Sequence, residues 1–114
     1  MAAFLIVDAD HNHREALAIA LRLDGHAVTA APSAKDGGAA LGSGRFDCCV
    51  VDVHLAGADA LLEAAERCGT CAVATGPYPE LLAAAAARHP RAGTLPKPFR
   101  AQDLTRVARA GVPG

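Results

Sequence analysis

Aromatic residues are scarce in this chain of 114 residues: they make up 4% of it, and tryptophan is absent. Hydrophobic residues of all kinds nevertheless reach 52%. We therefore expect one domain of ordinary length, with an aliphatic core rich in Ala and Val. A core of such small side chains leaves little room for a large internal ligand cavity.

Long hydrophobic runs are missing as well. Residues 2–7 are apolar, but this run ends at Asp8 and has no basic flank. A membrane-spanning helix needs about 20 apolar residues. We expect a soluble, cytoplasmic protein with no membrane association, whose four cysteines are free thiols in a reducing compartment.

Neither sign of charge dominates the chain. The net charge of −1 argues against a general nucleic-acid-binding protein. The charge is unevenly distributed, however: residues 1–66 carry ten acidic and four basic residues, and residues 67–114 carry two acidic and seven basic ones. This asymmetry is either ordinary scatter on solvated helices or a basic partner-binding face.

Strand patterns alternate with helix patterns along the chain. The predicted strands cover residues 4–7, 26–30, 46–53, 70–75 and 93–95, and the predicted helices cover residues 10–24, 32–41, 58–68, 80–89 and 100–110. A turn is expected at residues 42–44. Gly37 and Gly38 should each weaken the second helix by about 1 kcal/mol relative to Ala. The alternation predicts a doubly wound α/β fold, a single parallel sheet with helices on both faces.

Polar residues stand at the carboxyl ends of four predicted strands, the edge at which open parallel sheets form their sites. These residues are Asp8, Asp52, Thr75 and Lys97. Carboxylates attract a hard cation such as Mg²⁺, and Lys and Thr side chains bind phosphoryl oxygens. An Asp carboxylate can itself be a nucleophile. The set predicts phosphoryl-acceptor chemistry.

Five segments, in order and over the whole chain, resemble the response-regulator receiver domain. The segments are residues 5–10 (opening strand and acidic pair), 46–52 (phosphoacceptor strand), 54–59 (the apolar-Pro-Gly-x-Asp-Gly loop), 73–76 (signalling Thr or Ser and a small neighbour) and 97–99 (Lys-Pro-Phe). Each is weakly specific alone, but five with fitting gaps make a strong resemblance. It implies a five-stranded sheet in the order 2-1-3-4-5.

The resemblance also implies roles for individual residues. Asp52 would be the phosphoacceptor, and Thr75 and Lys97 would bind the phosphoryl oxygens. The implied Mg²⁺ ligands are Asp8, Asp52, the backbone carbonyl of His54 and, as a further candidate, Asp10.

Four positions depart from the family pattern. Ala9 replaces the second acid, and Asp10 stands one place too late, so weakened Mg²⁺ binding is expected. Ala56 replaces the usual Pro of the loop, and Ala60 replaces the usual Gly. Thr94 stands where an aromatic ring usually flips on activation, so the usual coupling of that ring to the signalling Thr cannot operate.

Cysteine offers an alternative site. The spacing of Cys68 and Cys71 suits a redox or zinc motif, but the pair follows a predicted helix instead of opening one. A structural zinc site would also need two further ligands. Buried small side chains are the favoured interpretation, as they are for Cys48 and Cys49 in the third predicted strand.

Histidines and nucleotide motifs offer weaker alternatives. His11, His13 and His54 border the acidic residues and would suit pH-sensitive or soft-metal chemistry, although solvated loop histidines are the favoured interpretation. Residues 7–12 lack every glycine of a dinucleotide-binding fingerprint, which disfavours a nucleotide-binding, flavodoxin-like enzyme.

The sequence thus predicts a receiver domain over residues 1–114, either whole or cut from a longer protein, that is not an enzyme. A histidine kinase or phosphotransfer protein would phosphorylate Asp52. The alternative is a pseudo-receiver that binds partners without phosphorylation, which the substitutions at Ala9 and Thr94 favour. A mainly monomeric protein is expected, with no direct nucleic-acid contact, docking an acidic target through the fourth helix, fifth strand and fifth helix. The arginines in this region are Arg88, Arg91, Arg100, Arg106 and Arg109.

Overall fold

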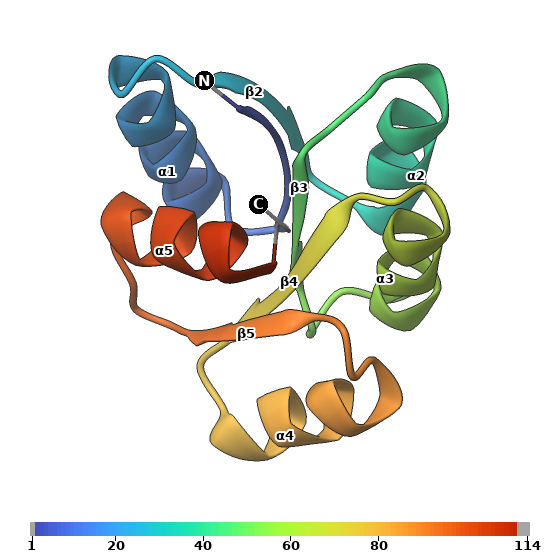
Figure 1. Cartoon of the computed structure of the whole chain (residues 1–114). Helices are drawn as coiled ribbons and strands as arrows, with labels where there is room; N and C mark the ends of the chain where they lie inside the picture. The colour runs from blue at the N-terminus through green and yellow to red at the C-terminus, as the bar shows by residue number, and fades with distance from the viewer. Residues whose placement is uncertain (1, 112–114) are drawn as a thin grey trace.

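The strand patterns pair into one parallel sheet in the order β2-β1-β3-β4-β5 (Figure 1). The computed structural model describes residues 2–111. Its strands are β1 (Ala3–Val7), β2 (Ala27–Ala31), β3 (Cys48–Asp52), β4 (Cys71–Gly76) and β5 (Gly93–Pro96). The predicted fold class and strand order are confirmed.

Helices connect successive strands and cover both faces of the sheet (Figure 1). They are α1 (His11–Leu23), α2 (Ala34–Ser43), α3 (Ala58–Arg67), α4 (Pro79–Arg88) and α5 (Ala101–Gly111). Side chains of α1 and α5 pack against one face of the sheet, and those of α2, α3 and α4 pack against the other. No helix within residues 2–111 has the length and hydropathy needed to cross a membrane.

The alternation of side chains along β1 shows why both faces are covered. Phe4 and Ile6 point toward α1 and α5, whereas Leu5 and Val7 point toward α2 and α3. All four are nearly or completely buried. A strand with apolar side chains on both faces can be stable only between two helical layers.

Several element boundaries differ from those predicted. The turn predicted at residues 42–44 is wrong for its first two residues, because α2 continues to Ser43, and buried Leu41 on this last turn offsets the weak propensity of Gly42. The third strand starts at Cys48 instead of Phe46. Ahead of it, the Asp47 carboxylate accepts a hydrogen bond from the Ala3 amide at 2.7 Å. The remaining elements shift by one or two residues.

Helix α2 has a close contact with the sheet at Gly37. A Cβ atom at this position would lie 2.8 Å from Val7 Cγ2 and 3.1 Å from Leu61 Cδ2. A Cβ atom at Gly38 would meet nothing within 4 Å. The two neighbouring glycines therefore have different roles, since Gly37 permits close packing and Gly38 only weakens the helix.

We expect the substitutions Gly37→Ala and Gly38→Ala to change stability in opposite directions. Gly38→Ala should raise the free energy of unfolding by about 1 kcal/mol, because Ala has the higher helix propensity. Gly37→Ala should lower it by about 1 kcal/mol, because overpacking of a dense core outweighs that gain. Urea denaturation of both variants measures the difference. Stabilisation by Gly37→Ala would show that the sheet and α3 yield easily.

Candidate functional site

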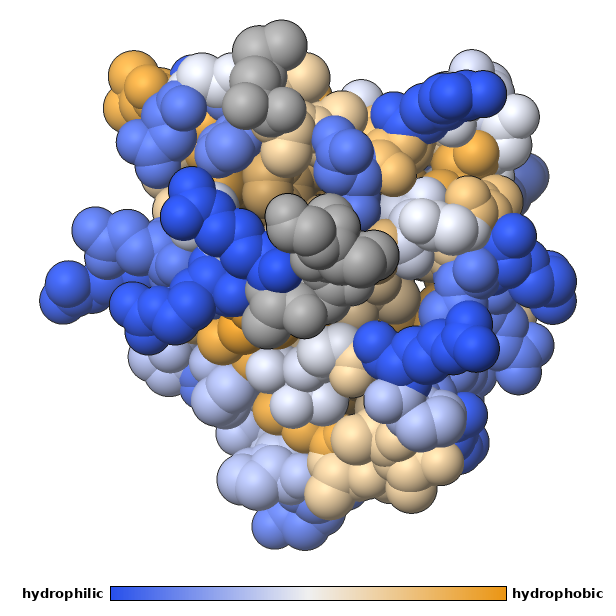
Figure 2. Space-filling view, in the orientation of Figure 1, coloured by the Kyte–Doolittle hydropathy of each residue, from blue (hydrophilic) through white to orange (hydrophobic). Residues whose placement is uncertain are grey.

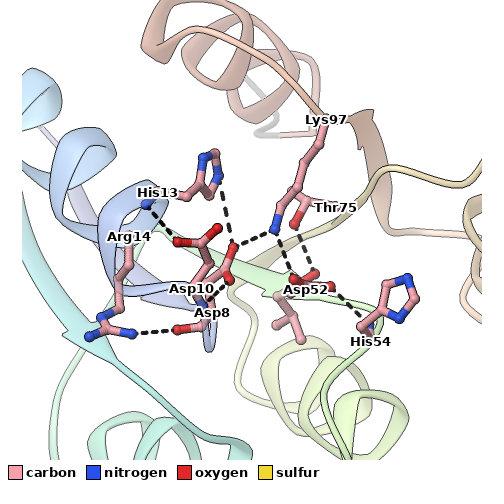
Figure 3. A network of polar contacts seen from close by, with 9 residues as sticks. Asp8, Asp10, His13, Arg14, Asp52, His54, Thr75 and Lys97 are labelled. Atoms are coloured by element: carbon pink, nitrogen blue, oxygen red, sulfur yellow. Dashed lines mark hydrogen bonds and ion pairs between the residues drawn. The ribbon is translucent and has the colours of Figure 1, made fainter.

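The carboxyl edge of the sheet brings together the polar residues that end its strands (Figure 3). Asp8 follows β1, and Asp52 is the last residue of β3. Thr75 in β4 pairs with Asp52 in the parallel register. Lys97 follows β5 and its peptide bond to Pro98 is cis. Four sequence-predicted residues thus share one site.

The ammonium group of Lys97 lies between two carboxylates. Its Nζ donates to Asp8 Oδ2 at 2.7 Å and to Asp52 Oδ2 at 2.8 Å. The side chains of Asp8, Asp52 and Lys97 are only 4%, 11% and 16% exposed. Burial disfavours the charged ammonium, but the hydrogen bonds to Asp52 and Asp8 outweigh it and raise the pKa of Lys97 above its usual value.

The second oxygen of each carboxylate binds the backbone of its own loop. Asp8 Oδ1 accepts from the Asp10 amide at 2.9 Å, and Asp52 Oδ1 accepts from the His54 amide at 2.8 Å. The Asp8 carbonyl also accepts from Arg14 Nη1 at 2.7 Å. These bonds fix both carboxylates so that their Oδ2 atoms converge on one point.

Asp10, the further candidate metal ligand, has another role in this structure. Its exposed side chain caps α1 by accepting from the His13 amide at 3.2 Å. This backbone hydrogen bond is the main reason why the pKa of Asp10 is lowered. Asp10 therefore contributes a negative charge beside Asp8 and is not hydrogen-bonded to Lys97.

The two remaining predicted site residues are differently exposed. Thr75 is 1% exposed, and its hydroxyl makes a long hydrogen bond of 3.5 Å to the Val51 carbonyl. His54 is exposed, and its ring packs edge-on against Tyr78, with 5.2 Å between the ring centroids. The hydroxyl and backbone at these positions lie beside Asp52 (Figure 3).

His13 is a site neighbour that the sequence interpretation placed in solvent. It lies in the first turn of α1, 23% exposed, with Nε2 3.8 Å from Asp8 Oδ2. Its ring also packs edge-on against Phe99, at 5.1 Å between centroids. The prediction of a solvated loop histidine is therefore wrong for His13. The helix predicted over residues 10–24 was the signal that His13 lies on a helix and not in a loop.

Within residues 2–111, no group of three or more His, Cys, Asp or Glu side chains is arranged to hold a metal ion. The two carboxylates alone nevertheless converge on one cation, the ammonium of Lys97. Carboxylate oxygens that converge in this way suit a hard divalent cation. Asp8 and Asp52 therefore fit such an ion, but they supply two carboxylates where a complete acidic site would supply three.

Comparison with known proteins shows the fold. No family model matches the chain, and no curated protein sequence does either. A CheY-like response-regulator receiver domain protein from Methanospirillum hungatei superposes with a TM-score of 0.83 at 22% identity, covering 96% of this chain and 92% of that one. TrrA from Thermotoga maritima, solved with Mg²⁺-BeF, gives 0.82 at 17% identity, covering 98% and 100%.

A third solved structure is NtrX from Brucella abortus. Its TM-score is 0.83 at 27% identity, over 96% of this chain and 26% of that longer protein. The three superpositions agree with the sheet order and with the helices on both faces. The chain therefore has the fold of response-regulator receiver domains.

Lys97→Met should destabilise the protein at neutral pH by about 2 kcal/mol, because it leaves two buried carboxylates facing each other without a cation. The pKa of Lys97 is raised in the folded state. Its contribution is therefore fully present below the unfolded lysine pKa of about 10.4 and is lost as the pH rises through the folded value. Chemical denaturation from pH 7 to pH 11.5 measures this difference.

The control is Lys35→Met, which removes an exposed lysine of α2. It should change stability little at any pH in this range. A wild-type advantage over Lys97→Met that stays constant through pH 11.5 would show that the ammonium is not the stabilising group.

Proposed function

We propose that this chain is a receiver domain that accepts a phosphoryl group on Asp52 from a histidine kinase or phosphotransfer protein. The observation that carries the proposal is the convergence of Asp8, Asp52 and Lys97, with Thr75 in register beside Asp52. The receiver fold supports it. The free thiols of the described cysteines fit a cytoplasmic setting.

In the transfer step, a carboxylate oxygen of Asp52 attacks the phosphorus atom of the donor. The bond from phosphorus to the donor breaks, and its electron pair leaves with the donor. Lys97 then exchanges its contact with Asp52 Oδ2 for a phosphoryl oxygen. The Thr75 hydroxyl, which has only a long bond to Val51 at rest, turns to another phosphoryl oxygen. Both groups stabilise the added charge.

A divalent cation, taken to be Mg²⁺, would be held by Asp8, Asp52 and the backbone carbonyl of His54. When bound it neutralises charge on the phosphoryl oxygens. The Mg²⁺-BeF complex of TrrA supports this assignment, since that protein has the same fold. Ala9 supplies no carboxylate, and Asp10 is engaged in capping α1, so we propose weak Mg²⁺ binding.

Incubation with a small phosphodonor and Mg²⁺, followed by intact-mass measurement, tests the proposal. The wild-type chain should gain one phosphoryl mass, and Asp52→Asn should gain none. The control Asp24→Asn removes an exposed carboxylate at the end of α1 and should react like wild type. Equal modification of wild type and Asp52→Asn would refute the role of Asp52. Absence of modification in every variant would favour a phosphorylation-independent pseudo-receiver, the second candidate, which Ala9 supports.

Ala9→Asp should strengthen Mg²⁺ binding by about tenfold, because the number of charged ligands tunes the affinity of a hard-cation site. Isothermal titration calorimetry measures the affinity. Ala60→Asp, on exposed α3 surface, adds the same charge outside the site and should change the affinity little. If Ala9→Asp brings no gain, another group such as Asp10 already fills the ligand position.

We further propose that the surface of α4, β5 and α5 docks an acidic partner. Figure 2 shows hydrophilic side chains over the α5 side and a pale, Ala-rich surface over α4. Arg88 is bound to Asp59 at 2.9 Å, and Arg106 lies 3.9 Å from Asp103. The remaining arginines of this surface are exposed positive charges: Arg91, Arg100 and Arg109.

Such a surface should repel a second copy of itself and attract a negatively charged partner. We therefore expect a monomer in sedimentation velocity even at low salt, where repulsion between like charges is strongest. A dimer that forms at low salt and is disrupted by Arg106→Glu/Arg109→Glu would contradict this expectation.

A further inference from the structure

The amino edge of the sheet, opposite the candidate site, carries a pair of adjacent thiols. Cys48 and Cys71 are the first residues of β3 and β4 and are direct partners in the parallel register. Both side chains belong to the face covered by α1 and α5, whereas Cys49 points to the other face. Neighbouring strands lie about 4.8 Å apart, within the Cα separations of roughly 4.4–6.8 Å that a disulfide spans.

The two thiols are chemically unequal. Cys48 is 1% exposed, and Cys71 is partly exposed. A hydrogen bond from the Cys48 thiol lowers the pKa of Cys71, and the same contact, followed by burial, raises the pKa of Cys48. Cys71 is thus the nucleophile of the pair, because the thiolate is the reactive form.

The two thiols line different cavities. Cys48 lines a cavity of about 220 Å³ that also includes Asp47 and Arg109, and Cys71 lines a cavity of about 190 Å³ that also includes Glu66 and Arg91. Each cavity thus has one arginine and one acidic side chain, so neither carries a net charge that would select the reagent. Small molecules can approach Cys71 through the second cavity although Cys48 itself is buried.

We propose that Cys71 and Cys48 form a redox-responsive thiol pair that reacts with low-molecular-weight disulfides and closes a disulfide between β3 and β4. The Cys71 thiolate attacks one sulfur of the reagent, whose S–S bond breaks and releases one thiolate. Cys48 then loses its proton to solvent and attacks the Cys71 sulfur, which expels the second thiolate. Two cysteine thiols are oxidised to one disulfide, and the reagent is reduced to two thiols.

The first step prepares the second. Cys48 is the register partner of Cys71, so it is the thiol in place to attack once the Cys71 sulfur is bonded to the reagent. Cys48 then becomes the resolving thiol.

Oxidation of the thiol pair also changes a contact with α5. In the reduced chain, Cys71 Sγ donates to the Ala108 carbonyl at 3.9 Å. A disulfide sulfur has no hydrogen to donate, so oxidation removes a contact with the last turns of α5 that the reduced chain makes while Cys71 is protonated. The redox state of the pair therefore changes how firmly the basic end of α5 is held.

Cys68 is the competing partner for Cys71, and the structure separates them. Cys68 is exposed at the end of α3, so the interpretation of this residue as a buried side chain is wrong. It lines a different cavity with Leu41 and Phe46, which pack on the α2 and α3 face. Cys68 will react with disulfides on its own account, so the test uses the full chain with Cys68→Ser as background.

The test exposes the folded Cys68→Ser protein to oxidised glutathione at neutral pH. Intact mass should show the loss of two hydrogens, and peptide mapping should join Cys48 to Cys71. Adding Cys48→Ser should trap a stable glutathione adduct on Cys71. Adding Cys71→Ser should slow all modification by about tenfold or more, because the thiols left are buried. Adding Cys49→Ala, which puts no polar group into the core, is the matched control and should leave the Cys48–Cys71 reaction unchanged.

Hydrogen exchange supplies the second readout. Amides in the last turn of α5 should exchange several-fold faster in the oxidised protein than in the reduced one. Absence of reaction in the folded protein, or reaction of Cys71 only after unfolding in urea, would overturn the proposal. So would unchanged exchange in α5 after oxidation, or a Cys68–Cys71 disulfide in place of Cys48–Cys71 when the wild-type chain is treated in the same way.

Discussion

The contact of one ammonium with two buried carboxylates determines the arrangement of the carboxyl edge. Lys97 binds the Oδ2 atoms of Asp8 and Asp52, and the Oδ1 atoms are bound to backbone amides of their own loops. Two carboxylates that are buried this deeply need a compensating cation. The ion pairs of Lys97 therefore hold the ends of β1, β3 and β5 together in addition to the hydrogen bonds of the sheet. Under the proposed function, a phosphoryl group or a metal ion that binds these Oδ2 atoms would compete with Lys97 for them.

Much of this arrangement could be predicted because it depends on local sequence patterns. Short apolar runs end at Asp8 and Asp52, and the parallel topology of a βα repeat places such strand ends at one edge. This placement predicts which residues form the site, but it does not predict the direction in which each side chain points. That Lys97 bridges both carboxylates, and that His13 packs between Asp8 and Phe99, depends on rotamers of residues far apart in the chain.

The helix boundaries show the same division between local and long-range determinants. Local sequence suffices at both ends of α1: either Asp10 or Asn12 is a suitable cap, and glycine suits the stop at residue 25. In the structure Asp10 caps the helix, and Gly25 has a φ of +90°. Gly37 was interpreted by its helix propensity alone. Its actual role is to admit the side chain of Val7 from β1 and that of Leu61 from α3, and no local pattern encodes those neighbours. Propensity is thus a sound guide only where a residue faces solvent, as at Gly38.

The two chemical features of the molecule occupy opposite ends of one pair of strands. Cys48 begins and Asp52 ends the five residues of β3, and their register partners in β4 are Cys71 and Thr75. Both ends also reach α5: Lys97 lies shortly before this helix begins, and Cys71 contacts Ala108 near its end. Under the two proposals, phosphorylation of Asp52 would change the contact that Lys97 makes just before α5, and oxidation of the thiols would remove the contact of Cys71 with Ala108 in α5.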